Sequence, residues 1–109
     1  MKKVEMQVKF VEALAKYLAV VELKYINYLK DYHFTHLGNG KGAVSYEEGS
    51  KYVKVMVGNH IHTFVEKING DILKARNWNS PAVNGVRGNI YSKDSGASVV
   101  DHYGAKYLR

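Results

Sequence analysis

The N-terminal segment carries apolar side chains at helical spacing. They recur every three or four residues, which is the period of an amphipathic α-helix, and the segment contains neither Gly nor Pro. We therefore predict one long helix over residues 3–32, with a break near residues 19–22 into two packed helices as the alternative. The apolar stripe consists of Val4, Val8, Val11, Leu14, Leu18, Val21, Tyr25 and Leu29.

Further apolar residues lie outside this stripe, among them Phe10, Val20, Leu23 and Ile26. An unbroken helix over residues 3–32 is about 45 Å long, which is more than a small sheet can cover. The excess predicts a contact with a second copy of the chain or with another protein. Two shorter helices that pack on each other are the alternative.

A glycine-rich connector is predicted over residues 33–50. A phosphate-binding loop requires two glycines at a fixed spacing, followed by Lys and then Ser or Thr, between a strand and a helix. The run from Gly38 to Gly42 has neither that spacing nor those flanks, so a loop is expected there and no nucleotide site.

Residues 51–78 show three short runs of alternating and β-branched positions, which is typical of antiparallel strands. Dipeptides that favour two-residue hairpin turns separate the runs. In chain order the strands and turns are 52–57, Gly58-Asn59, 60–68, Asn69-Gly70 and 71–78.

The segment 79–109 is interrupted by glycines and is predicted to be irregular. Pro81 ends the third strand or begins a loop, residues 88–91 form a possible fourth strand, and residues 98–107 form a short helix or an ordered tail. Together these elements predict a single α+β domain over residues 1–109. A long N-terminal helix over residues 1–32 packs on an antiparallel meander of three to four strands.

Two-residue turns fix the register of the meander, and the register assigns each side chain to a face. A one-residue bulge would reassign the faces. The face predicted to lie against the helix carries Val53, Val55, Val57, Phe64, Leu73 and Ala75. The predicted open face carries Tyr52, Lys54, Lys67, Lys74, Arg76 and Trp78, above Met56, Ile61, Val65 and Ile72.

Sixteen Lys and Arg against ten Asp and Glu give a net charge of +6, which favours an anionic partner such as nucleic acid, phospholipid or an acidic protein. Cations neutralise phosphates and aromatic rings stack on bases. The open face is therefore predicted to bind nucleic acid, single strands in particular. Tyr52 and Trp78 are expected to stack, while Lys54, Lys67, Lys74, Arg76 and Arg87 neutralise phosphates.

The alternative is a protein-interaction module. In that interpretation the sheet face is solvated, or is covered by the C-terminal third or another subunit, and its cations serve solubility. The apolar helix then mediates homo-oligomerisation or binds a host protein.

Neither an enzyme nor a cofactor is predicted. The chain has no cysteine, and it contains no nucleophile elbow, no His paired with a nearby acid and no spaced carboxylates. His60 and His62, on one side of a strand, are weak candidates for metal ligands, with His33 and His36 as a second pair. No third ligand is placed beside either pair.

The start of the chain resembles a signal peptide only over Met1-Lys2-Lys3. Glu5, Lys9 and Glu12 break the apolar run that should follow. No stretch approaches the roughly 18 uncharged apolar residues of a membrane helix. A cytoplasmic protein without membrane contact is expected.

The stretch 62–91 contains a hairpin with Gly-Asp-Ile, then Lys, Trp, a Pro-Ala pair and an Arg-Gly-Asn-Ile run. In this combination it resembles small uncharacterised proteins of tailed bacteriophages. The resemblance implies a phage-encoded protein made in the bacterial cytoplasm that acts on DNA, RNA or a host factor. The matching residues are Gly70-Asp71-Ile72, Lys74, Trp78, Pro81-Ala82 and Arg87-Gly88-Asn89-Ile90.

Overall fold

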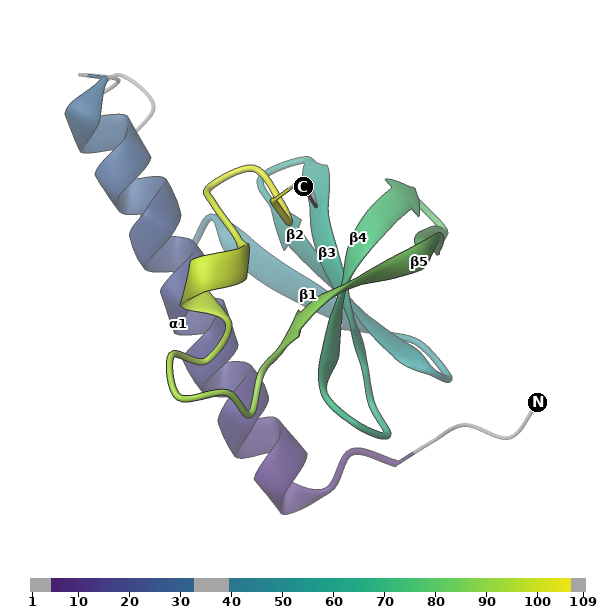
Figure 1. Cartoon of the computed structure of the whole chain (residues 1–109). Helices are drawn as coiled ribbons and strands as arrows, with labels where there is room; N and C mark the ends of the chain where they lie inside the picture. The colour runs from purple at the N-terminus through teal and green to yellow at the C-terminus, as the bar shows by residue number, and fades with distance from the viewer. Residues whose placement is uncertain (1–4, 33–39, 107–109) are drawn as a thin grey trace.

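The computed structural model of the chain describes residues 5–32 and 40–106. Figure 1 shows a long helix, α1 (Val8–Asp31), beside a strongly twisted sheet, with the C-terminal segment between them. The five strands pair antiparallel in chain order, which confirms the predicted α+β fold with five strands in place of three to four. They are β1 (Val44–Glu48), β2 (Tyr52–Val57), β3 (His60–Glu66), β4 (Asp71–Asn77) and β5 (Ser80–Asn89), followed by the 3-10 helix η2 (Ala97–Val99).

Helix α1 is continuous over 24 residues, so the alternative of a break near residues 19–22 is wrong. One face of α1 is buried against the sheet. Leu14, Val21 and Leu29 of the predicted stripe are buried, whereas Val8 and Val11 are exposed. Tyr17 and Val21 at its centre are fully buried. The core between the helix and the sheet contains Phe10, Leu14, Tyr17, Val21, Val53, Val55, Val57, Val65, Ile72, Ile90 and Val100.

The two edge strands were not predicted. Strand β1 lies inside the segment 33–50 that was interpreted as a connector, and four of its five side chains are exposed, so it shows no alternating apolar pattern. Strand β5 takes up ten residues of the segment 79–109 that was predicted to be irregular, and it overlaps the possible fourth strand at 88–91 only at residues 88–89. Pro81 lies within β5, and an edge strand tolerates proline because one side of its backbone needs no partner.

The turn at Asn69-Gly70 is longer than predicted. The pairing of Phe64 with Leu73 leaves four residues, 67–70, between the strands. The Gly70 N–H donates to the Glu66 carbonyl over 2.8 Å, and Gly70 has φ +78°. The register therefore moves by two residues, which leaves every side chain of β4 on the same face as before.

A bulge in β3 has the larger effect. Val55 pairs with Thr63 and Met56 pairs with Ile61, so His62 is an extra residue on β3. After the bulge, the alternation of side chains along β3 is shifted by one residue relative to β2. The side chains of β3 beyond His62, and those of β4 that pair with them, therefore lie on the face opposite to the one predicted. The two predicted faces are therefore wrong for these strands.

Val65 and Ile72, predicted on the open face, belong to the core under α1. Phe64 and Leu73, predicted against the helix, are buried outside that core.

Gly96 is held tightly beside this core. It has φ +90°, and a Cβ there would overlap Ile72 Cδ1 and approach Tyr17 to 3.3 Å. We expect Gly96→Ala to lower the free energy of unfolding by about 2 kcal/mol, measured by urea denaturation, because it adds both backbone strain and overpacking.

Gly58→Ala is the matched control for the backbone alone. Gly58 has φ +58°, but a Cβ there would meet nothing within 4 Å. An equal loss of stability in the two variants would contradict the close packing of Gly96.

Candidate functional site

The seven residues predicted to form one nucleic-acid-binding face are divided among three places. One group lies on the sheet face turned away from α1, a second lines or adjoins a groove beside the C-terminal segment, and one residue is buried. The prediction of a single face is wrong because the bulge turns β4 over relative to β2. The groups are Tyr52, Lys54 and Trp78; Lys74, Arg76 and Arg87; and Lys67.

Lys67 is not available to a ligand. Its side chain has no exposed surface, and its ammonium forms a direct ion pair with the Glu48 carboxylate. Lys67 therefore fastens the β3–β4 turn to the end of β1, and its predicted contact with phosphate is wrong.

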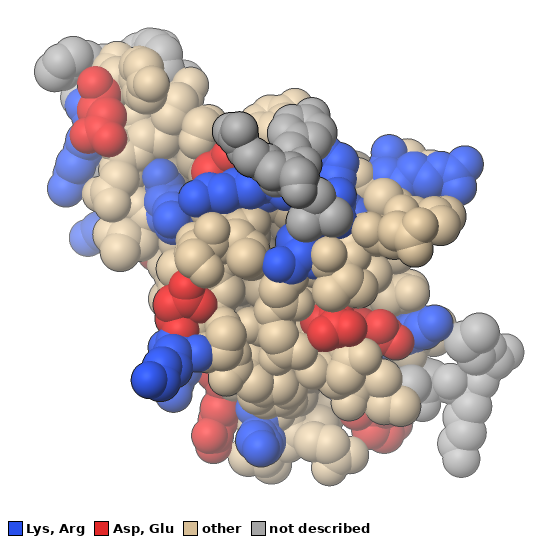
Figure 2. Space-filling model, viewed as in Figure 1, with Lys and Arg blue, Asp and Glu red and all other residues tan. Residues whose placement is uncertain are grey.

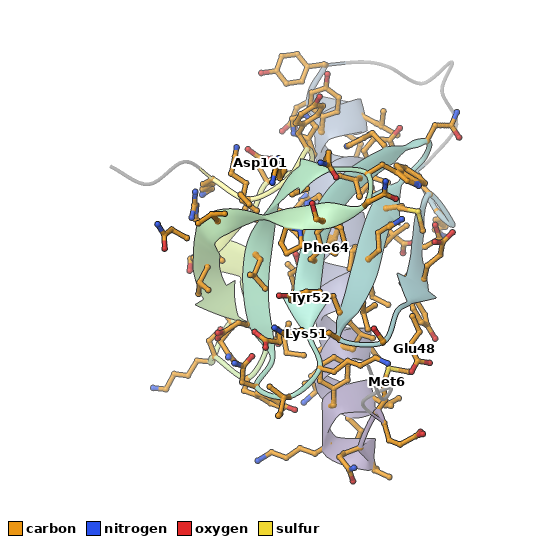
Figure 3. The ribbon with its side chains drawn as sticks, turned by 90° about the vertical axis from the view of Figure 1, so that its right-hand side faces the viewer. Met6, Glu48, Lys51, Tyr52, Phe64 and Asp101 are labelled. Carbon is orange, nitrogen blue, oxygen red and sulfur yellow. The ribbon has the colours of Figure 1, made fainter. Side chains whose placement is uncertain are left out.

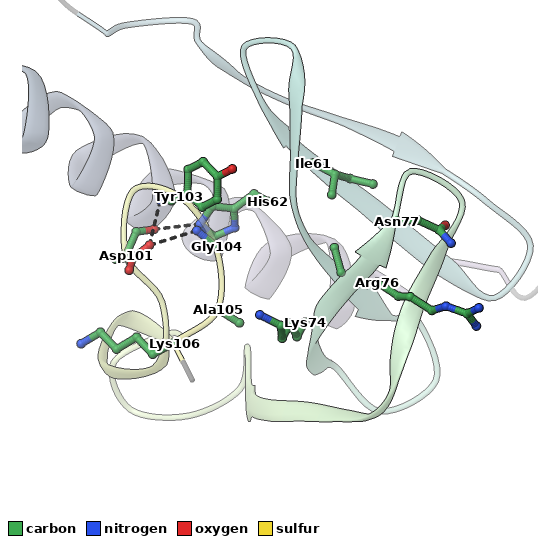
Figure 4. A pocket seen from close by; sticks show the side chains of 11 residues that line it. Ile61, His62, Lys74, Arg76, Asn77, Asp101, Tyr103, Gly104, Ala105 and Lys106 are labelled. Carbon is green, nitrogen blue, oxygen red and sulfur yellow. Dashed lines mark hydrogen bonds between the residues drawn. The ribbon is translucent and has the colours of Figure 1, made fainter. Parts of the chain in front are cut away.

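The groove lies between β3 and β4 on one side and the C-terminal segment on the other, with a volume of about 520 Å³. Lys74 and Arg76 stand on its β4 wall, and Lys106 stands on the opposite wall. In Figure 4 Lys74 points toward Ala105, whereas the Arg76 side chain extends outward from the strand. Cations from two separate elements thus line one concave surface.

Histidines hold the C-terminal wall of the groove in place. The His62 Nε2–H donates to the Asp101 carbonyl over 2.8 Å, and the His60 ring stacks on Tyr103 with 4.8 Å between centroids. The His102 ring stacks on Tyr28 of α1 at 3.7 Å. The wall is therefore joined to both the sheet and the helix.

A second bond to this wall comes from β5. Arg87 Nε donates to the Lys106 carbonyl over 3.2 Å, and its Nη1 donates to the Asn84 carbonyl over 3.1 Å. Arg87 thus positions the segment that carries Lys106 and lies at the edge of the groove. Lys106 itself was not predicted as a site residue, because no periodic pattern marks the C-terminal segment.

Beneath the groove His62 belongs to a buried chain of hydrogen bonds. A carbonyl only accepts, so His62 carries its proton on Nε2 and accepts at Nδ1 from the Thr63 hydroxyl over 3.0 Å. Thr63 in turn accepts from the Tyr17 hydroxyl over 2.6 Å. Burial lowers the pKa of His62 to about 4 and raises the pKa of Tyr17, so both stay neutral.

Asp101 is the carboxylate on the groove wall. Its partial burial opposes ionisation, but N–H groups of Tyr103 and Gly104 donate to Oδ1 over 2.8 and 3.0 Å and keep its pKa below the ordinary value. The Asp101 carboxylate thus stabilises its own turn through these two hydrogen bonds.

Figure 2, in the same view as Figure 1, shows Lys and Arg side chains gathered in a band across the upper half of the molecule.

On the other face of the sheet, Trp78 lies over a lysine. Lys54 Nζ is 4.5 Å from the centroid of the Trp78 ring and 3.7 Å from a Glu47 oxygen. Tyr52 meets Phe64 edge to face at 6.0 Å, and Figure 3 shows these two residues near the centre of this face. Trp78 keeps 47% of its surface exposed, so it covers Lys54 and still presents a ring to solvent.

Trp78 and Asn79 form the two-residue turn between β4 and β5. The Asn77 side-chain oxygen accepts the backbone N–H of Asn79 over 2.8 Å and that of Ser80 over 3.1 Å, which fixes the turn. The signal in the sequence was an Asn whose side chain can bond to the backbone two residues later. It was missed because the predicted third strand was extended to residue 78.

The weak metal candidates do not converge. His60 is stacked on Tyr103, and His62 is enclosed in the buried chain of hydrogen bonds. Within residues 5–32 and 40–106, no group of three His, Cys, Asp or Glu side chains is placed to hold a metal ion. His33 and His36 lie outside the described residues.

Comparison with known families identifies the family to which the chain belongs. A family model matches residues 1–108, which is nearly the whole chain. The chain belongs to a family of unknown function, DUF7717. No curated protein and no solved structure matches it. Membership in DUF7717 therefore assigns no activity. In the described part of the chain, no helix is long and apolar enough to cross a membrane.

Proposed function

We propose that this member of DUF7717 is a small non-enzymatic domain that binds single-stranded nucleic acid. The supporting observation is the groove of about 520 Å³ between β4 and the C-terminal segment, lined by Lys74, Arg76 and Lys106. Concave surfaces lined by charge of one sign concentrate ions of the opposite sign, and phosphate contacts supply most nucleic-acid affinity. The net charge of +6 also favours the binding of a polyanion.

The position of Trp78 favours a single strand over a duplex. The Trp78 ring is half exposed at the tip of the β4–β5 turn. Trp78 directly follows Asn77, which lines the groove. A base has to leave its own stack before it can lie on a protein ring. A strand whose phosphates occupy the groove reaches Trp78 at the end of the groove where Arg76 and Asn77 lie.

Trp78→Ala is expected to weaken the binding of a short single-stranded oligonucleotide about tenfold, because one base loses its stacking partner. Lys106→Ala, which removes one phosphate contact, is expected to cost less. The affinity is measured by fluorescence anisotropy of a labelled oligonucleotide. Trp78→Phe is the control that keeps a ring, and an unchanged affinity of folded Trp78→Ala would exclude this stacking role.

A second candidate function is a protein interface on α1. Val8, Val11 and Leu23 leave 75%, 45% and 57% of their surface exposed, so α1 presents apolar side chains to solvent at several points along its length. If α1 mediates self-association, light scattering will show an oligomer at micromolar concentration that Leu23→Glu converts to a monomer. A monomeric parent protein would exclude this mode of assembly.

A further inference from the structure

The β4–β5 turn separates two concave surfaces. Asn77, at the start of the turn, lines the groove described above, and Asn79 lines a hollow of about 410 Å³ on the opposite face of the sheet. Trp78 stands between them at the tip. A strand that leaves the groove over this turn therefore passes Trp78 before it meets the hollow.

The hollow has aromatic walls and polar groups at its rim. Tyr52 and Phe64 line it, in edge-to-face contact at 6.0 Å. The ammonium groups of Lys51 and Lys54 both lie over rings, at 5.3 Å from the Tyr52 centroid and 4.5 Å from that of Trp78. Glu47, with 64% of its side chain exposed, presents a carboxylate at the same rim.

These groups suit a base better than a phosphate. Two carboxylates, those of Glu47 and Glu48, line the hollow beside two lysines, so the lining has no excess of positive charge to attract a phosphate. The partly exposed Tyr52 ring is the flat surface open to a base, since Phe64 is only 3% exposed. A volume of about 410 Å³ falls within the range of small-molecule sites.

We infer that the hollow holds one unstacked base of the strand whose phosphates lie in the groove, and that it favours bases with an exocyclic amino group. The inference rests on the proposed nucleic-acid binding. The selectivity comes from Glu47, since an ionised carboxylate only accepts hydrogen bonds. It pairs with the N4 amino group of cytosine and repels the O4 carbonyl of uracil.

The test uses three oligonucleotides of about 12 residues with equal numbers of phosphates. They are oligodeoxycytidylate, oligodeoxyuridylate and an abasic backbone. We expect oligodeoxycytidylate to bind at least about fivefold more tightly than oligodeoxyuridylate and at least about tenfold more tightly than the abasic strand. Equal, salt-sensitive binding of all three would overturn the base site and leave the groove standing. No binding of any of them would overturn both.

Glu47→Gln tests the assignment of the selective group. A glutamine amide both donates and accepts, so the preference for cytosine over uracil should shrink below about twofold while binding of the abasic strand is not weakened. Glu12→Gln, at an exposed position of α1, removes the same charge and should keep the preference. A preference that survives in Glu47→Gln would overturn the role of Glu47.

Discussion

The double variant Arg76→Glu with Lys106→Glu is expected to bind single-stranded oligonucleotides at least about 100-fold more weakly than the parent protein, with its stability nearly unchanged. Both side chains are exposed and stand on opposite walls of the groove. Each substitution removes a cation that neutralises a phosphate and introduces repulsion. The slope of log affinity against log salt should fall by about 0.7 for each phosphate that is no longer neutralised. Anisotropy titrations over a range of salt concentrations measure both quantities.

The matched control is Lys16→Glu with Lys30→Glu, two exposed lysines of α1. This variant has the same net charge as the groove variant, so it reports the effect of charge alone. Its affinity should fall by less than about tenfold. Equal losses in the two variants would show that the affinity follows net charge and that the groove has no special part in it.

Lowering the pH from above 6.5 to 4 is expected to lower the free energy of unfolding by about 3 kcal/mol through His62 alone. Burial reduces the pKa of His62 from 6.5 to about 4 in the folded protein. Between these values the unfolded chain binds a proton that the folded protein does not. The contribution of His62 is therefore present above pH 6.5, is lost as the pH falls from 6.5 toward 4, and levels off below pH 4.

Urea denaturation at several pH values measures this contribution. His62→Gln removes the titrating group, so its stability should vary less between pH 6.5 and 4 than that of the parent. His60→Gln, in which a half-buried histidine two residues away is replaced, should retain the dependence of the parent. A parent protein with constant stability across this range would contradict the buried, neutral state of His62.

The elements with a strong periodic signal could be predicted from the sequence. The stripe through Leu14 and Val21 specified α1, and the alternation on both sides of Gly58-Asn59 specified β2 and β3 with a correct turn. Strand β1 could not be predicted in this way because its side chains are mostly exposed. Strand β5 is irregular, with shifts in its pairing to β4, and its Pro and Gly residues resemble a loop in the sequence.

The candidate site could be predicted only in part. Lys74 and Arg76 line the groove, whereas Lys67 is buried and Lys106 was not predicted. Arg76 and Trp78 are both exposed, as expected, yet the first points to the groove side and the second covers Lys54. One extra residue at His62 causes this separation, and nothing in the run His60-Ile61-His62 shows which residue bulges. The reason lies in tertiary structure, because the bulge lets His62 and Thr63 both bond within the chain that begins at Tyr17.

The most direct measurement is the fluorescence of Trp78, the only tryptophan of the chain, during titration with single-stranded DNA and RNA at low and at physiological salt. The proposed function requires a change in emission that saturates, weakens as salt increases and is smaller with a duplex of the same sequence. An emission that stays constant, from a protein shown to be folded, would contradict the binding of nucleic acid at this turn.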